Sequence, residues 1–150
     1  MKKTLQRPAG WPASLSTPVV SPIAPSVVYA SASPDELDSQ YEGRETGYTY
    51  AREGHPNADV LAQRIDALEG ASGGLVVGSG MAAVSAVLLG LCKTGDHVIG
   101  ADQLYGRSLR MMAEDLPRLG IATSLVDATD AKAVAEATLQ ATKIVLIEVM

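Results

Sequence analysis

Leu75-Val76-Val77-Gly78-Ser79-Gly80-Met81-Ala82-Ala83 is the stretch that decides the fold class of this chain. Its apolar beginning predicts a short strand over residues 75–77, and the apolar run from Met81 to Leu91 predicts a buried helix. A strand that turns through glycines into a helix directs free backbone N–H groups and the positive helix end toward one point. The stretch therefore predicts an anion site, suited above all to phosphate, at which Ser79 adds a hydroxyl donor. A plain glycine turn capped by Ser79 is the structural alternative.

Helices and strands alternate on both sides of this stretch. Upstream, Asn57 is expected to cap a helix with Leu61, Ile65 and Leu68 on its apolar face, and Gly70 is expected to end it. Downstream, the pattern predicts strands over 97–99, 122–126 and 143–149, and helices over 108–119 and 131–142. Such alternation is typical of βαβ units with a parallel sheet, and the last strand has the continuous apolar run of a sheet centre.

The amino-terminal residues have a different composition. Six of the eight prolines lie within residues 1–34, a density that disfavours helix and predicts an extended arm packed on another surface. Residues 33–49 are polar and charged, and they include Gly43 and Gly47. They predict a loop or short helical turn of the kind that closes over sites.

The overall composition disfavours several classes of protein, among them nucleic-acid-binding, membrane-spanning and secreted proteins. A chain of 150 residues with 47% hydrophobic content can bury one core, and a net charge of −5 with scattered basic residues disfavours nucleic acid as a partner. The longest apolar run is too short for a membrane span and the first residues lack a secretory apolar region, so a cytoplasmic protein is expected. Cys92 is the only cysteine and is expected to be a small buried filler. His55 and His97 have no partners at metal-ligand spacing, so no metal site is expected.

Two further interpretations follow from the spacing of residues. The sequence ends at Met150 just after a predicted central strand, so we expect a fragment of a longer protein or a shortened gene product, with a small complete domain as the alternative. Gly78, Gly80 and Ala83 fit the pattern GxGxxA, and Asp102 lies 22 positions after Gly80. A dehydrogenase domain of the Rossmann type that binds NAD is therefore a competing prediction. It leaves the proline-rich arm unexplained.

Five motifs occur in order along the chain. They are Tyr50-Ala51-Arg52 with Gly54 and Pro56, Leu68-Glu69-Gly70, Ser79-Gly80-Met81-Ala82-Ala83, Gly95-Asp96-His97-Val98, and Leu104-Tyr105-Gly106. This set resembles the cysteine and methionine metabolism family of pyridoxal 5′-phosphate enzymes, which includes cystathionine γ-synthases, cystathionine β- and γ-lyases and methionine γ-lyases. The resemblance extends from about Thr17 to Glu148. It implies an α/β fold of fold type I, like that of aspartate aminotransferase.

The resemblance also implies a division of the chain. Residues 1–56 would be an arm and loop that contribute to a neighbouring subunit's site, and residues 57–150 would be part of the large domain that binds the cofactor. Tyr50 and Arg52 would reach the phosphate of the neighbouring subunit's pyridoxal 5′-phosphate. An arginine suits that role because its planar, permanently charged group binds phosphate through two donors. A homo-oligomer, expected to be a dimer of dimers, follows from a site shared in this way.

The other implied roles lie in the second part. Ser79 and the amides of Gly80 and Met81 would hold the cofactor phosphate, and Tyr105 would lie over the pyridine ring. Glu148 corresponds to a family glutamate near the substrate, although Val149 and Met150 replace the residues that usually follow it.

The implied reaction is elimination or replacement of a sulfur-linked group at the β or γ carbon of a sulfur amino acid. In the family, the Schiff-base lysine and the carboxylate that keeps the pyridine nitrogen protonated lie beyond residue 150. Lys93, Lys132 and Lys143 do not match the lysine position, so residues 1–150 alone are predicted to be catalytically inert. A non-catalytic remnant that assembles with an intact subunit is the remaining alternative.

Overall fold

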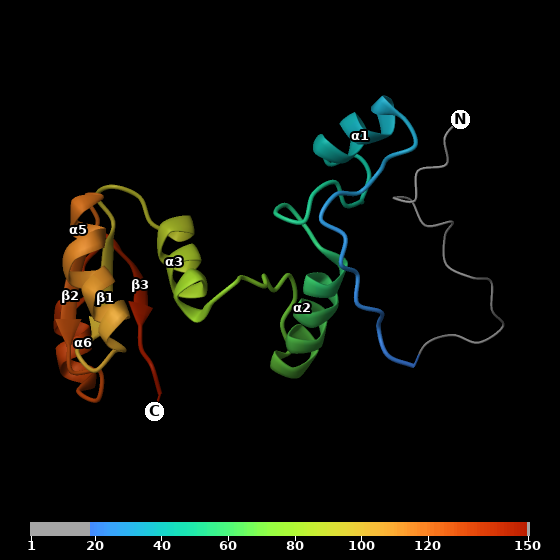
Figure 1. The fold of residues 1–150 in the computed structure, drawn as a ribbon. Coiled ribbons are helices and arrows are strands. Elements are labelled where there is room, and N and C mark those ends of the chain that lie inside the picture. The colour runs from blue at the N-terminus through green and yellow to red at the C-terminus, as the bar shows by residue number, and fades with distance from the viewer. Residues whose placement is uncertain (1–18, 150) are drawn as a thin grey trace. The chain divides into compact units, whose positions relative to one another are not determined.

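The computed structural model describes residues 19–149. These residues form two compact units, which divide between Val76 and Val77. The sequence-based division at residues 56 and 57 falls inside the first unit, at the start of a helix. In Figure 1 the described residues of the first unit are coloured from blue to green, and those of the second from yellow-green to red.

Helix α1, Pro34–Tyr41, forms the polar segment of the first unit. The hydroxyl of Ser33 accepts the Glu36 N–H at 3.2 Å, and the Glu36 carboxylate accepts the Ala32 N–H at 2.7 Å. This reciprocal capping, together with acidic residues in the first turn, explains why a polar segment forms a helix. The predicted loop or short helical turn over 33–49 is thus an eight-residue helix followed by a loop.

Helix α2, Pro56–Glu69, begins one residue before the predicted cap. The expectation that Asn57 caps it is wrong, because His55 Nδ1 accepts the Asn57 N–H at 3.2 Å and Pro56 occupies the first helical position, where a missing N–H costs nothing. The Asn57 side chain instead donates to the Pro22 carbonyl at 2.7 Å and accepts the Ala24 N–H at 2.8 Å. Asn57 therefore fastens the arm to α2. Gly70 ends the helix with φ 64°, which confirms its predicted role.

The described part of the arm, residues 19–32, contains no helix, as its prolines predict. An antiparallel bridge pairs Val28 with Tyr50, and the N–H groups of Tyr29 and Ala51 donate to the carbonyls of Thr49 and Val27. The prolines at positions 8, 12 and 18 lie outside the described residues.

The second unit contains a parallel sheet in the order β2-β1-β3, formed by Ala122–Val126, His97–Ala101 and Thr142–Leu146. The parallel arrangement confirms the sequence prediction. The central position predicted for the last strand is wrong within the described residues, because β1 is the central strand and β3 lies at an edge with Val145 half exposed. An apolar run shows only that a strand has surface to bury. Which strands lie beside it, and therefore whether it is central, depends on the rest of the fold.

Two expectations about residues 75–91 are also wrong. Residues 75–77 form no strand and are exposed, and helix α3, Gly80–Leu91, buries only Leu88. A strand exists where a neighbour completes its hydrogen bonds, and an apolar helix is buried where another element covers it. Among residues 19–149 nothing provides that neighbour for residues 75–77 or covers most of α3.

A continuous helical segment follows β1. It consists of α4, Gly106–Arg110, the π-helical turn η1, Met111–Asp115, and α5, Leu116–Arg118. Pro117 explains the wide turn, because it has no N–H to donate and its ring would clash with the carbonyl four residues earlier. The N–H of Leu116 accordingly donates to Met111, five residues back.

The core of this unit lies between the helical segment and the sheet. Its buried residues are Leu88, Val98, Ala101, Leu104, Met111, Met112, Leu116 and Ile121. Buried His97 links all three strands, because Nδ1 lies 2.8 Å from Thr142 Oγ1 and Nε2 lies 3.0 Å from Ser124 Oγ. Cys92, predicted to be a small buried filler, packs against this core and is partly buried.

Helix α6, Ala131–Ala137, is shorter than the predicted 131–142. Thr138 leaves the helical conformation with ψ 122°, and the Thr142 hydroxyl then accepts the Leu139 N–H at 2.8 Å. Among the described helices, none has both the length and the apolar content needed to cross a bilayer.

Candidate functional site

The amino-terminal end of α3 has the donors that an anion requires. Ser79 is the N-cap, and its hydroxyl accepts the Ala82 N–H at 3.1 Å while its carbonyl accepts the Ala83 N–H at 3.1 Å. The amides of Gly80 and Met81 have no hydrogen-bond partner within residues 19–149. Two free donors therefore remain at the positive end of a twelve-residue helix.

Open space surrounds these donors. A Cβ atom added at Gly78 or Gly80 would meet no atom within 4 Å, so intramolecular packing does not require glycine at either position. Glycine instead leaves room for a ligand to approach the backbone. The first turn of α3 contains no acidic residue that would repel an anion.

Tyr105 and Glu148 come together in the same unit, although 43 positions separate them. The Tyr105 N–H donates to Glu148 Oε2 at 2.7 Å, and the Ser108 hydroxyl donates to Glu148 Oε1 at 3.0 Å. The Ser108 hydroxyl also lies 3.9 Å from the Met81 sulfur. Ser108 therefore contacts two of the predicted site residues, Met81 and Glu148, and Glu148 in turn contacts Tyr105.

Sequence reasoning missed Ser108. The sequence shows only a serine two positions after Gly106, and a serine near the start of a helix is common for capping reasons alone. That this serine is buried is seen only in the structure. Its role depends on a carboxylate 40 positions away.

Tyr50 and Arg52 lie together in the first unit. The Arg52 guanidinium carbon is 4.6 Å from the centroid of the Tyr50 ring, within the range of a cation–π contact. The Arg52 side chain is 75% exposed, and its ion pair with Glu53 spans 3.8 Å, so this pair contributes little. Arg52 is thus available to an external anion.

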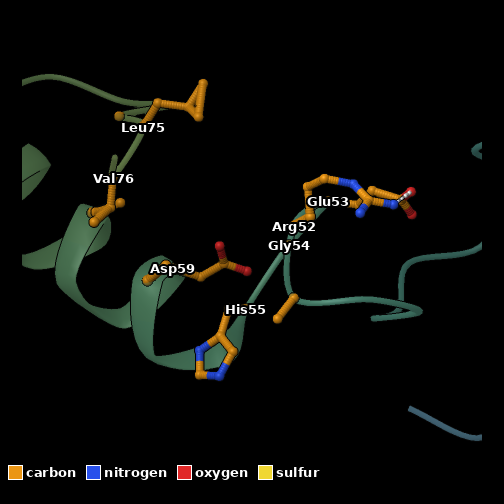
Figure 2. Close-up of a pocket in the computed structure, with 11 residues that line it drawn as sticks. Arg52, Glu53, Gly54, His55, Asp59, Leu75 and Val76 are labelled. Atoms are coloured by element: carbon orange, nitrogen blue, oxygen red, sulfur yellow. Dashed lines mark ion pairs between the residues drawn. The ribbon is translucent and has the colours of Figure 1, made fainter. Parts of the chain in front are cut away.

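Arg52 also lines a pocket of about 160 Å³ in this unit. Figure 2 shows Arg52 beside Glu53, with Asp59 projecting from α2 and Leu75 and Val76 on another wall.

Tyr48 anchors the segment that contains Tyr50 and Arg52. Its hydroxyl donates to Asp59 at 2.6 Å, and its ring lies 5.5 Å from the ring of Tyr29. The hydrogen bond to Asp59 raises the pKa of Tyr48 above its ordinary value. With the bridge to Val28, these contacts tether the segment to both α2 and the arm.

Among the residues that the structure describes, no three or more His, Cys, Asp or Glu side chains gather as they would around a metal ion. The donors in the second unit are instead backbone amides and hydroxyls, which suit a phosphate.

The second unit is an α/β domain with a parallel sheet, and the amides at the start of α3 are open to an anion. Residues 11–150 match the family described as Cys/Met metabolism PLP-dependent enzyme, and the chain belongs to this family.

Two relatives of established name illustrate the similarity. L-methionine gamma-lyase of Fusobacterium nucleatum is 32% identical over 140 residues, which cover 93% of this chain and 35% of that protein. Cystathionine beta-lyase MetC of Bacillus subtilis is 42% identical over 101 residues, which cover 67% of this chain and 26% of the relative. The chain therefore spans about a third or less of the length of these relatives.

A solved structure supports the same fold. A Campylobacter jejuni protein assigned as an O-acetylhomoserine (thiol)-lyase, which contains N'-pyridoxyl-lysine-5'-monophosphate, superposes with a TM-score of 0.78 at 30% identity. The match covers 83% of this chain and 31% of that one. The fold is accordingly the α/β fold of fold type I, as predicted.

The competing dinucleotide interpretation loses its basis. Its fingerprint requires a strand that leads into the glycine turn, and residues 75–77 form none among the described residues. The family match, in contrast, also accounts for the arm from residue 11 onward.

Proposed function

We propose that this chain provides the phosphate-binding part of a pyridoxal 5′-phosphate site in an enzyme of sulfur amino acid metabolism. The proposed reaction class is elimination or replacement of a sulfur-linked group at the β or γ carbon, by a lyase or a cystathionine synthase. The proposal is supported by the family match and by the free amides of Gly80 and Met81 next to the Ser79 hydroxyl.

The amino-terminal end of α3 is the observation that carries the proposal. A phosphate monoester presents acceptor oxygens and a charge of about −1.5 to −2 at neutral pH. The Gly80 and Met81 amides supply two donors, and the Ser79 hydroxyl can donate its proton while its oxygen continues to accept the Ala82 N–H. A Cβ-sized group at Gly78 or Gly80 would meet no atom of a non-adjacent residue within 4 Å, so the backbone there is open to a ligand.

The remaining residues would orient the cofactor. Tyr105, with 62% of its surface exposed, would cover one face of the pyridine ring and restrict its tilt. Arg52 would bind a phosphate of the neighbouring subunit, and Tyr50 would hold the guanidinium in place through their contact. Glu148 lies on the same side of the domain as Tyr105 through their hydrogen bond. When bound, pyridoxal 5′-phosphate supplies an electron sink for charge that develops at the substrate's α carbon.

The proposal extends to the assembly. If Arg52 acts on a neighbouring subunit's phosphate, the working form is a homo-oligomer, for which we propose a dimer of dimers in the cytoplasm. The proposed substrates are cysteine, homocysteine, cystathionine or methionine. The 150-residue chain by itself is proposed to bind the cofactor without turnover, because Lys93, Lys132 and Lys143 do not match the family's lysine position.

A binding titration tests the site directly. Pyridoxine 5′-phosphate is the appropriate probe, because it lacks the aldehyde that would react with surface lysines, and pyridoxine without phosphate is the matched ligand control. We expect calorimetry to show that the phosphate ester binds at least about tenfold more tightly than pyridoxine, which corresponds to about 1.4 kcal/mol. Equal affinity for both ligands would contradict the proposal.

A mixing experiment tests whether Arg52 acts between subunits. Ser79→Asp weakens phosphate binding at α3 of one chain and Arg52→Ala removes the guanidinium from another, so neither variant alone should bind the probe well. Mixing them should restore binding at a fraction of the sites, because a mixed pair contains one site with both Ser79 and Arg52. Arg44→Ala is the control, since Arg44 is exposed and pairs with Glu42. Hybrid oligomers that form without restored binding would favour an assembly remnant.

A further inference from the structure

Glu148 has both of its carboxylate oxygens engaged by the loop and helix that contain Tyr105. Oε2 accepts the Tyr105 N–H at 2.7 Å, and Oε1 accepts the Ser108 hydroxyl at 3.0 Å. The first distance lies in the short range of hydrogen bonds to a charged acceptor. Glu148 therefore fixes the main chain of one residue and the side chain of another in the same helical turn.

These contacts replace a missing cap. Tyr105 is the N-cap of the helical segment that begins at Gly106, and its own side chain makes no capping hydrogen bond. A negative charge at the first turn is favoured by the unpaired N–H groups and by the helix dipole. Glu148 provides that charge from just beyond β3. Its hydrogen bond therefore connects the chain after the last strand to the start of the helical segment.

Ser108 extends the connection to α3. Its side chain is fully buried, and the hydroxyl that donates to Glu148 lies 3.9 Å from the Met81 sulfur. The Glu148–Ser108 and Ser108–Met81 contacts thus join the second residue after β3, the first turn of α4 and the first turn of α3. Both elements proposed to face the cofactor are tied to one carboxylate.

The Tyr105 ring itself has no such restraint. Within residues 19–149 its hydroxyl makes no hydrogen bond, and more than half of its surface is exposed. The main chain of Tyr105 therefore limits where the ring can lie. Glu148 accepts a hydrogen bond from the N–H group of that main chain.

We propose that Glu148 is a positioning residue that does not contact substrate and acts by holding the main chain of Tyr105. This inference rests on the proposed function, in which the Tyr105 ring covers the cofactor. Loss of the carboxylate should release the Tyr105 loop and weaken ligand binding only through that ring.

Two measurements on the 150-residue chain test the inference. The first is amide hydrogen exchange without ligand, in which Glu148→Ala should speed exchange of the Tyr105 N–H about tenfold, as expected for loss of a charged hydrogen bond discounted for exposure. Glu148→Gln, which keeps one carbonyl oxygen, should have a smaller effect. Glu136→Gln is the control, because Glu136 is an exposed α6 residue whose carboxylate pairs with Lys132 at 3.7 Å.

The second measurement is the affinity for pyridoxine 5′-phosphate in a double-mutant cycle. Tyr105→Leu and Glu148→Ala should each weaken binding, and the double variant should be no weaker than Tyr105→Leu alone. Additive losses would overturn the inference, because Glu148 would then act on the ligand independently of Tyr105.

The two failures are distinguishable. If the Tyr105 N–H exchanges at the same rate in Glu148→Ala as in the wild type, Glu148 does not hold that main chain. The inference is then overturned whatever the binding measurement gives. If Tyr105→Leu binds pyridoxine 5′-phosphate as tightly as the wild type, the Tyr105 ring does not cover the cofactor. The proposed role of Tyr105, and with it this inference, is then overturned even if exchange is faster in Glu148→Ala.

Discussion

Ser79→Asp separates the folding role of Ser79 from its proposed role in binding. Aspartate caps helices about as well as serine, and its charge is favoured at a helix amino terminus by about 0.3 to 1 kcal/mol. The variant should therefore keep the bond now made to the Ala82 N–H at 3.1 Å, and its stability should equal or slightly exceed that of the wild type. Ser79→Ala, which loses the bond, should be less stable by about 1 kcal/mol.

The expected effect of Ser79→Asp on phosphate binding is larger. The end of α3 is exposed, so water screening applies, and two unit charges about 4 Å apart repel by about 1 kcal/mol. A phosphate monoester with close to two charges gives about 2 kcal/mol, which is about a 30-fold loss of affinity. Loss of the hydroxyl donor adds to this value. The repulsion should weaken as salt is added.

Calorimetric titration with pyridoxine 5′-phosphate measures the affinity, and urea unfolding followed by circular dichroism measures the stability. The reasoning is refuted if folded Ser79→Asp binds the phosphate ester within about twofold of the wild type. It is also refuted if pyridoxine, which lacks the phosphate, loses as much affinity as the ester, because the loss would then not come from charge.

Three further predictions concern the second unit. Met112→Ala should lower the free energy of unfolding by about 2 to 5 kcal/mol in urea titrations, since Met112 is fully buried, and a loss below 1 kcal/mol would contradict its place in the core. Hydrogen bonds from the side chain and the backbone of Thr129 lower the pKa of Asp127, so its contribution to stability is present above the ordinary pKa of about 3.9 and is lost as the pH falls through the lower folded value. The stability difference between wild type and Asp127→Asn should therefore shrink below about pH 4, and a constant difference from pH 7 to pH 3 would exclude this linkage. Burial first, and then the charge of Asp96, raises the pKa of the Cys92 thiol, so a disulfide reagent at pH 8 should label it more slowly in the folded chain than in urea, and equal rates would argue against the partial burial of Cys92.

The sequence by itself predicted the features that depend on local chemistry. Strand β2 has the predicted bounds, and Gly70 ends α2 because only a residue that tolerates φ near +64° fits there. The Ser79 cap and the free amides at the start of α3 were predicted from Gly78, Ser79 and Gly80, because caps and free helix amides are properties of a few consecutive residues. The family could be identified for the same reason, since its motifs are short and ordered.

Only the tertiary structure decided which surfaces meet. The apolar pattern of α3 and of β3 shows that both have surface to bury, yet most of α3 is exposed and β3 lies at the sheet edge in the part of the chain that the structure describes. The hydrogen bonds from Tyr105 and Ser108 to Glu148 are likewise absent from any sequence pattern. Periodicity encodes the polarity of each face, whereas a contact between residues more than 40 positions apart depends on how the strands pair and bring distant segments together.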